Sequence, residues 1–67
     1  MTELNSYRAY FLSSSDHIRD VRAVKAPDHS SAQAAAELML QQSEYAAVEI
    51  YEGWRLIWRS DREQQAA

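Results

Sequence analysis

The sequence predicts a two-layer α+β domain with the element order strand, strand, helix, strand, strand (ββαββ). Two short segments with aromatic or alternating apolar residues come first, one alanine-rich segment of helical spacing follows, and two more alternating segments complete the pattern. The simplest compact arrangement of these elements is a single four-stranded sheet with the helix on one face. A chain of 67 residues has room for one such domain with a small core.

The first two strands are expected over residues 7–12 and 18–26. The first is rich in aromatic residues and is followed by a run of serines that favours a turn. The second alternates between apolar and polar residues, but its phase changes near Asp20 and Val21, as a β-bulge would cause. Pro27 has no amide hydrogen and favours an extended residue before it, so the second strand should end there.

The helix is expected over residues 31–42, which are nearly all strong helix formers. Either Asp28 or Ser30 can serve as its N-cap, and Ser30 with Gln33 has the spacing of a capping box. Residues recurring at intervals of three and four form one apolar stripe that should face the sheet: Ala32, Ala35, Ala36, Met39 and Leu40.

The last two strands are expected over residues 47–51 and 55–59, joined across Glu52 and Gly53 as a hairpin. A two-residue loop places Tyr51 opposite Trp54, and a three-residue loop shifts the pairs by one.

The favoured strand order is 2-1-3-4, in which the third strand pairs with the first and the sheet is antiparallel. The alternative pairs the third strand with the second and makes the helix a right-handed parallel crossover. Residues 7–59 form the domain in this reading, and we expect residues 1–6 and 60–67 to be flexible ends.

Composition restricts the function classes. The chain has no cysteine, which excludes disulfides and thiolate metal sites and favours the cytoplasm. Its net charge of −3 opposes binding to phosphate backbones and anionic lipids. It has no apolar run near the roughly 20 residues of a membrane helix, so no membrane association is expected. The N-terminus shows no pattern of a secretory signal.

The second face of the sheet is the feature of the sequence that points to a function. One helix covers one face, so side chains of the other parity must meet water or another protein. The expected register puts side chains of the last hairpin there, joined by Tyr10 and Leu12 if the first strand buries its residues of the other parity. The expected interface residues are Tyr10, Tyr51, Trp54, Leu56 and Trp58. Large exposed apolar patches are typical of interaction sites.

The sequence therefore predicts a non-catalytic protein-interaction module. A homodimer is the expected assembly, because a twofold interface uses one patch twice and adds buried surface to a thin core. An unidentified protein partner is also compatible with this face. In the competing interpretation, Trp54 and Trp58 fold over the sheet edge and bury their rings within the monomer.

Single-stranded nucleic-acid binding is the alternative function. The aromatic residues could stack on bases while the arginines and Lys25 contact phosphates. However, Asp20, Glu49 and Glu52 lie on the same expected strands, and alternating charges usually form cross-strand pairs on a solvated face. Nucleic acid is therefore the less favoured partner.

The sequence shows no constellation for catalysis or for a metal or other cofactor. His17 and His29 are the two imidazoles, and neither has the closely spaced second ligand of a structural metal site. His17 follows three serines, but nothing in the pattern supplies an orienting acid together with an oxyanion hole. We therefore expect no catalytic, cofactor-binding or metal-binding residues.

Two resemblances add context. Several short motifs resemble a group of short uncharacterised bacterial proteins, known chiefly from alphaproteobacteria: Tyr7, Tyr10-Phe11-Leu12, Asp16-His17-Ile18, Ala35-Ala36, Val48-Glu49-Ile50-Tyr51, Gly53 and Arg55. This resemblance implies a bacterial cytoplasmic protein and supplies no activity or ligand. The element order is also similar in outline to antitoxins with a partial ferredoxin-like fold, which implies a regulatory, antitoxin-like module as a further alternative function. The Pro/Gly-rich segment that precedes the helix in such proteins is absent.

Overall fold

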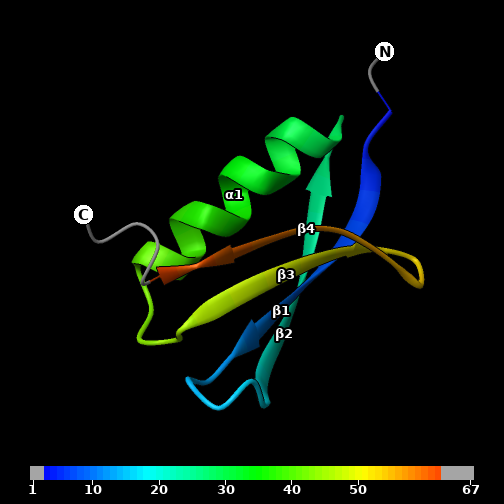
Figure 1. The fold of residues 1–67 in the computed structure, drawn as a ribbon. Coiled ribbons are helices and arrows are strands. Elements are labelled where there is room, and N and C mark those ends of the chain that lie inside the picture. Colours follow the sequence, from blue (N-terminus) through cyan, green and yellow to red (C-terminus); the bar gives the residue numbers. More distant parts are fainter. Residues whose placement is uncertain (1–2, 63–67) are drawn as a thin grey trace.

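The computed structural model describes residues 3–62 and confirms the predicted α+β architecture. One antiparallel sheet has the strand order β2-β1-β3-β4, and α1 lies across one face of this twisted sheet (Figure 1). The elements in chain order are β1 (Asn5–Leu12), β2 (Ile18–Ala26), α1 (His29–Gln41), β3 (Ala47–Glu52) and β4 (Arg55–Asp61). The favoured strand order is thus the observed one.

The core lies between α1 and the sheet. Tyr7, Ala9 and Phe11 of β1 are buried there, together with residues of the neighbouring strands. The helix contributes the predicted stripe: Ala32, Ala36 and Leu40 are buried, and Ala35 and Met39 pack against the core. The alanines bring the helix backbone close to the sheet and leave space for large rings from the strands.

Helix α1 begins after Asp28, which is the N-cap. Its carboxylate accepts a hydrogen bond from the backbone N–H of Ser31 at 2.8 Å, and this bond lowers the pKa of Asp28. The alternative cap, Ser30, lies inside the helix. Within residues 3–62, no helix combines the length and apolar character needed to cross a bilayer.

The predicted irregularity in β2 is present, one residue earlier than expected. Phe11 pairs with Asp20 whereas Leu12 pairs with Ile18, so Arg19 is the extra residue of a β-bulge. Two residues on the bulged strand then oppose one on the partner strand. The bulge places Ile18 beside Leu12 on the sheet face away from α1.

The hairpin register differs from the one predicted. The turn consists of Gly53 and Trp54, and Glu52 pairs with Arg55. Gly53 has φ +66, the left-handed value that the first central residue of such a turn requires and that glycine adopts without a steric penalty. Trp54 therefore lies at the tip of the hairpin instead of opposite Tyr51, which pairs with Leu56.

The predicted position of Trp58 is wrong, because β4 contains a second bulge. The register shifts between Tyr51 and Ile50, so that Ile50 pairs with Trp58 and Ile57 is the extra residue. Ile57 and Trp58 both pack against the core on the helix side. Trp58 is thus not a member of the face away from the helix, because the bulge reverses the alternation that the sequence pattern suggested.

The ordered strands extend beyond the domain bounds expected from the sequence. Asn5 and Ser6 belong to β1, and Ser60 and Asp61 belong to β4. Arg62 donates hydrogen bonds to the carbonyl oxygens of Leu40, Ser43 and Tyr45, the last at 2.7 Å from Nε. The remaining parts of the two expected flexible ends, residues 1–2 and 63–67, lie outside the described residues.

Replacing Arg62 by Met should lower the free energy of unfolding by about 1–2 kcal/mol. The variant removes a partly buried cation from carbonyl groups at the C-terminal end of α1, where the helix dipole favours positive charge. Urea denaturation measures the change. The matched control is Arg55→Met, an exposed position at the start of β4, the strand that ends just before Arg62, and equal midpoints for the two variants would contradict the assignment.

The Asp28 cap should make stability depend on pH in the acid range. Because the folded state lowers the pKa of Asp28 below its ordinary value of 3.8, the stabilisation is fully present above that value and is lost as pH falls through the folded-state pKa. Asp28→Asn keeps a capping oxygen but removes this titration. Thermal melts at several pH values below 4 should therefore show a shallower decline for the variant, and equally steep declines would contradict the prediction.

Candidate interaction surface

The sheet face away from α1, here called the open face, is defined by the strand register. Four residues of β1, namely Ser6, Arg8, Tyr10 and Leu12, alternate with the buried ones and so face away from α1. Cross-strand partners in an antiparallel sheet lie on the same face, so the residues paired with these four also belong to the open face. Its residues are Ser6, Arg8, Tyr10, Leu12, Ile18, Val21, Ala23, Lys25, Ala47, Glu49, Tyr51, Leu56, Arg59 and Asp61. Within residues 3–62, no helix or strand packs on this face.

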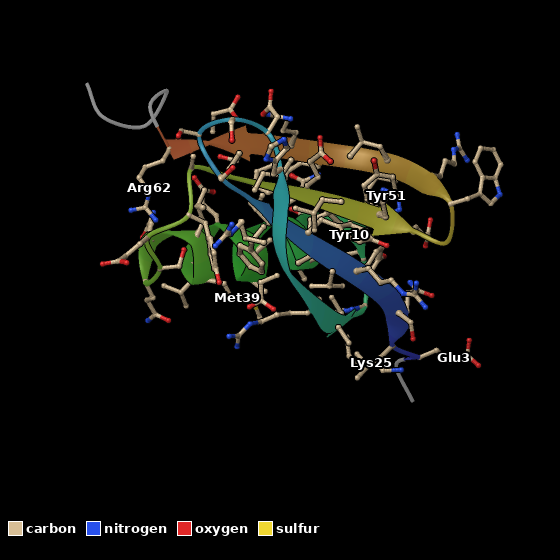
Figure 2. All side chains as sticks on the ribbon, turned by 90° about the horizontal axis from the view of Figure 1, so that it is seen from below. Glu3, Tyr10, Lys25, Met39, Tyr51 and Arg62 are labelled. Carbon is tan, nitrogen blue, oxygen red and sulfur yellow. The ribbon has the colours of Figure 1, made fainter. Side chains whose placement is uncertain are left out.

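Two tyrosines form the centre of the open face. The rings of Tyr10 and Tyr51 are 5.0 Å apart between centroids and meet edge to face at 87°. Figure 2 shows them side by side on the neighbouring strands β1 and β3. Val21 lies opposite Tyr10, and Leu56, which is 47% exposed, lies opposite Tyr51. Apolar surface therefore continues across all four strands.

Trp54 extends this surface at the tip of the hairpin. Its side chain is 89% exposed, and it lines a shallow hollow with Tyr10, Ile18 and Tyr51. We call the resulting set the apolar patch: Tyr10, Ile18, Val21, Tyr51, Trp54 and Leu56.

The structure therefore brings together four of the five predicted interface residues, all except Trp58. It adds Ile18 and Val21, which sequence reasoning missed. Both lie in a strand whose bulge decides the face of each residue, and the phase change near Asp20 was the available signal.

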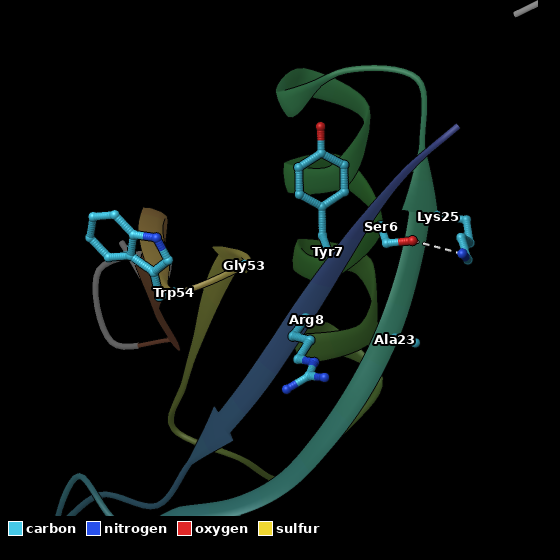
Figure 3. A pocket seen from close by; sticks show the side chains of 7 residues that line it. All are labelled: Ser6, Tyr7, Arg8, Ala23, Lys25, Gly53 and Trp54. Atoms are coloured by element: carbon cyan, nitrogen blue, oxygen red, sulfur yellow. Dashed lines mark hydrogen bonds between the residues drawn. The ribbon is translucent and has the colours of Figure 1, made fainter. Parts of the chain in front are cut away.

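One end of the open face is basic. Arg8 of β1 and Lys25 of β2 lie there, and Lys25 Nζ donates a hydrogen bond to Ser6 Oγ at 2.7 Å. Figure 3 shows these side chains with Trp54 around a second hollow, which Tyr7, Ala23 and Gly53 complete. Among the described residues, those that line this hollow include no carboxylate.

The other end of the open face is acidic. Arg59 is hydrogen-bonded to the carboxylates of Asp16, Glu49 and Asp61, each with a shortest contact of 2.9 Å. These bonds, led by the one to Asp16, raise the pKa of Arg59 above its ordinary value. One guanidinium among three carboxylates leaves two negative charges uncompensated. Arg59, Asp16 and Asp61 line a hollow with Ala47, which pairs with Leu12, and both of these residues are buried outside the main core.

Other arginines on the strands are placed away from the open face. Arg22 pairs with Ala9 on the helix side and forms an ion pair with Asp20 at 3.2 Å. Arg55 lies opposite Glu52, which is on the helix side as well. The aromatic patch is thus flanked by cations at one end, instead of lying within the basic surface that the nucleic-acid hypothesis requires.

The two histidines occupy separate exposed sites. His17 Nδ1 lies 3.5 Å from Ser15 Oγ in the first turn, but the neighbouring Asp16 carboxylate is bonded to Arg59. His29 Nε2 lies 3.3 Å from a carboxylate oxygen of Glu52, and its ring meets Tyr7 edge to face. Residues 3–62 contain no group of three or more His, Asp or Glu residues arranged to hold a metal ion.

Comparisons of the chain with protein-family models, curated proteins and solved structures find no match. The resemblance to short bacterial proteins stays a prediction. Function is therefore argued from the geometry of the open face.

Replacing Arg59 by Gln should lower the free energy of unfolding by about 1 kcal/mol, since three carboxylates lose their shared cation. Salt screens the repulsion between the remaining carboxylates, so the loss should shrink in 0.5 M NaCl, roughly three times physiological ionic strength. Urea denaturation at both salt concentrations tests this. Arg55→Gln is the control, and a salt-independent loss would contradict the electrostatic explanation.

Proposed function

We propose that this protein is a small interaction module that associates with a second copy of itself through the open face. The observation that carries the proposal is the apolar patch, whose residues come from all four strands and the hairpin tip. Soluble monomers rarely expose contiguous apolar surface on this scale without using it. We propose no catalytic activity for it.

The side-chain types of the apolar patch support this proposal. Tyrosine and tryptophan are enriched in protein interfaces, since they bury a large area while their polar atoms keep hydrogen-bonding capacity. Tyr10 and Tyr51 are held in contact at the centre, and Trp54 projects beyond them. Central aromatic residues of this kind usually supply most of the binding energy of an interface.

A second copy is the partner that the small core favours. The buried core of the described chain is formed by one helix and four strands, and four of its buried residues are alanines. Domains of this size have little stability to spare, so covering the apolar patch would stabilise the fold as well as the complex. A twofold dimer does this for both copies with one type of contact.

The nucleic-acid alternative receives less support from the position of the cations. Arg59, the open-face cation on β4, is bound to three carboxylates, and Arg8 and Lys25 lie at one end. A strand of nucleic acid crossing the tyrosines would approach Glu49 and Asp61 at the other end.

Light scattering at micromolar concentration should give about twice the chain mass of 7.7 kDa. Leu56→Lys, which puts a charge into the apolar patch beside Tyr51 at a half-exposed position, should give the monomer mass at the same concentration. The far-ultraviolet circular dichroism of the variant should stay that of the parent protein.

The matched control is Leu38→Lys, because Leu38 is 55% exposed on α1 and lies away from the open face. This variant should keep the dimer mass. A parent protein that is monomeric up to high concentration would overturn the proposed function, and so would a Leu56→Lys variant that dimerises as well as the parent.

A further inference from the structure

We infer that the two copies associate with their strands antiparallel, so that Arg8 and Lys25 of each copy face Asp16 in the other, at the acidic end of the open face. This inference rests on the proposed self-association and specifies its geometry. It follows from two observations: the basic and acidic residues of the open face lie at opposite ends of the strands, and the apolar patch lies between them.

The order of groups along β1 fixes these positions. From its start, the open face presents Ser6, Arg8, Tyr10 and Leu12. Lys25 pairs with Ser6 at the first end, and Ala47, beside the Arg59 network, pairs with Leu12 at the other. The two tyrosines lie between these ends. The charges are therefore separated along the strand direction. Arg8 and Lys25 lie on β1 and β2, and the carboxylate at the other end of these two strands is Asp16, in the turn that joins them.

A twofold dimer that packs face to face has its axis in the plane between the sheets. With the axis along the strands, each basic end would face the other basic end, and the acidic ends would also meet. With the axis across the strands, each basic end faces an acidic end, and the tyrosines still meet at the centre. Like charges that face each other across an interface oppose association, so the charges select the second arrangement.

The second arrangement also gives Trp54 a place to pack. An axis across the strands keeps β4 facing β4 and β2 facing β2 while it exchanges their ends. The hairpin tip of one copy then reaches the hollow that Ala46, Ala47, Arg59 and Asp61 line in the other. An indole over the aliphatic and guanidinium surface of Arg59 is a favourable contact in proteins. Lys25 and Arg8 approach Asp16, whose side chain is 71% exposed.

Two charge variants test the arrangement. The acidic variant carries Arg8→Glu and Lys25→Glu at the basic end. The basic variant carries Ser14→Lys and Asp16→Asn at the acidic end, where Ser14 lines the hollow beside Arg59. Asn is chosen because Asp16 has φ +63, which asparagine tolerates better than most residues do. Circular dichroism and thermal melts establish that both variants are folded.

Each variant alone should self-associate at least about tenfold more weakly than the parent protein, because its facing ends now carry like or unpaired charges. An equimolar mixture should regain association to within about threefold of the parent, and native mass spectrometry should show the heterodimer as the main dimer. The control variant Arg19→Glu with Arg55→Glu makes the same change in net charge. Both of its positions are exposed and lie outside the open face, so it should self-associate like the parent.

The outcomes separate this inference from the proposed function. If the parent is a dimer, each charge variant dimerises as well as the parent, and the mixture shows no preference for the heterodimer, the antiparallel arrangement is overturned. The proposed dimer itself would still hold. Stronger self-association of either variant would point to the arrangement with like ends together and would also overturn the inference. A monomeric parent would overturn the proposed function itself.

Discussion

This structure depends on the fact that a single helix can cover only one face of a four-stranded sheet. Helix α1 covers one side of a four-stranded sheet, and its alanines let it lie close enough to bury Tyr7, Phe11 and Ile50. A sheet with one helix has a second face, and residues 3–62 hold no further helix or strand to cover it. At one end of that face Arg59 binds three carboxylates beside Ala47, and the part between the ends is apolar.

Two β-bulges decide which large side chains fall on which face. The bulge at Ile57 turns Trp58 toward the alanine-rich helix, where a large ring fills the space that small residues leave. The bulge at Arg19 places Ile18 on the open face. Each indole thus has a different environment although the two lie four residues apart. One completes the core, and the other projects from the hairpin tip.

The element order, the strand order and the helix stripe could be predicted from local patterns, because the alternation of a strand and the spacing of a helix can be recognised within a short segment such as Ala32 to Leu40. The faces of individual residues depended on features that such patterns specify weakly. An inserted residue in β4 reverses the alternation for Trp58, and both Ile57 and Trp58 then pack against the core. The partners of Arg59 come from the first turn, β3 and β4, so no local pattern connects them. The same holds for the contacts of Arg62.

The position of Arg62 has a consequence for folding during synthesis. This side chain binds carbonyl groups at the end of α1 and in the following loop, some twenty residues earlier in the chain. When α1 has left the ribosome, those carbonyls do not yet have this donor, and β4, which brings Trp58 to the core, has not been made. The contacts that complete residues 3–62 therefore form only after Arg62 has joined the chain, behind all four strands.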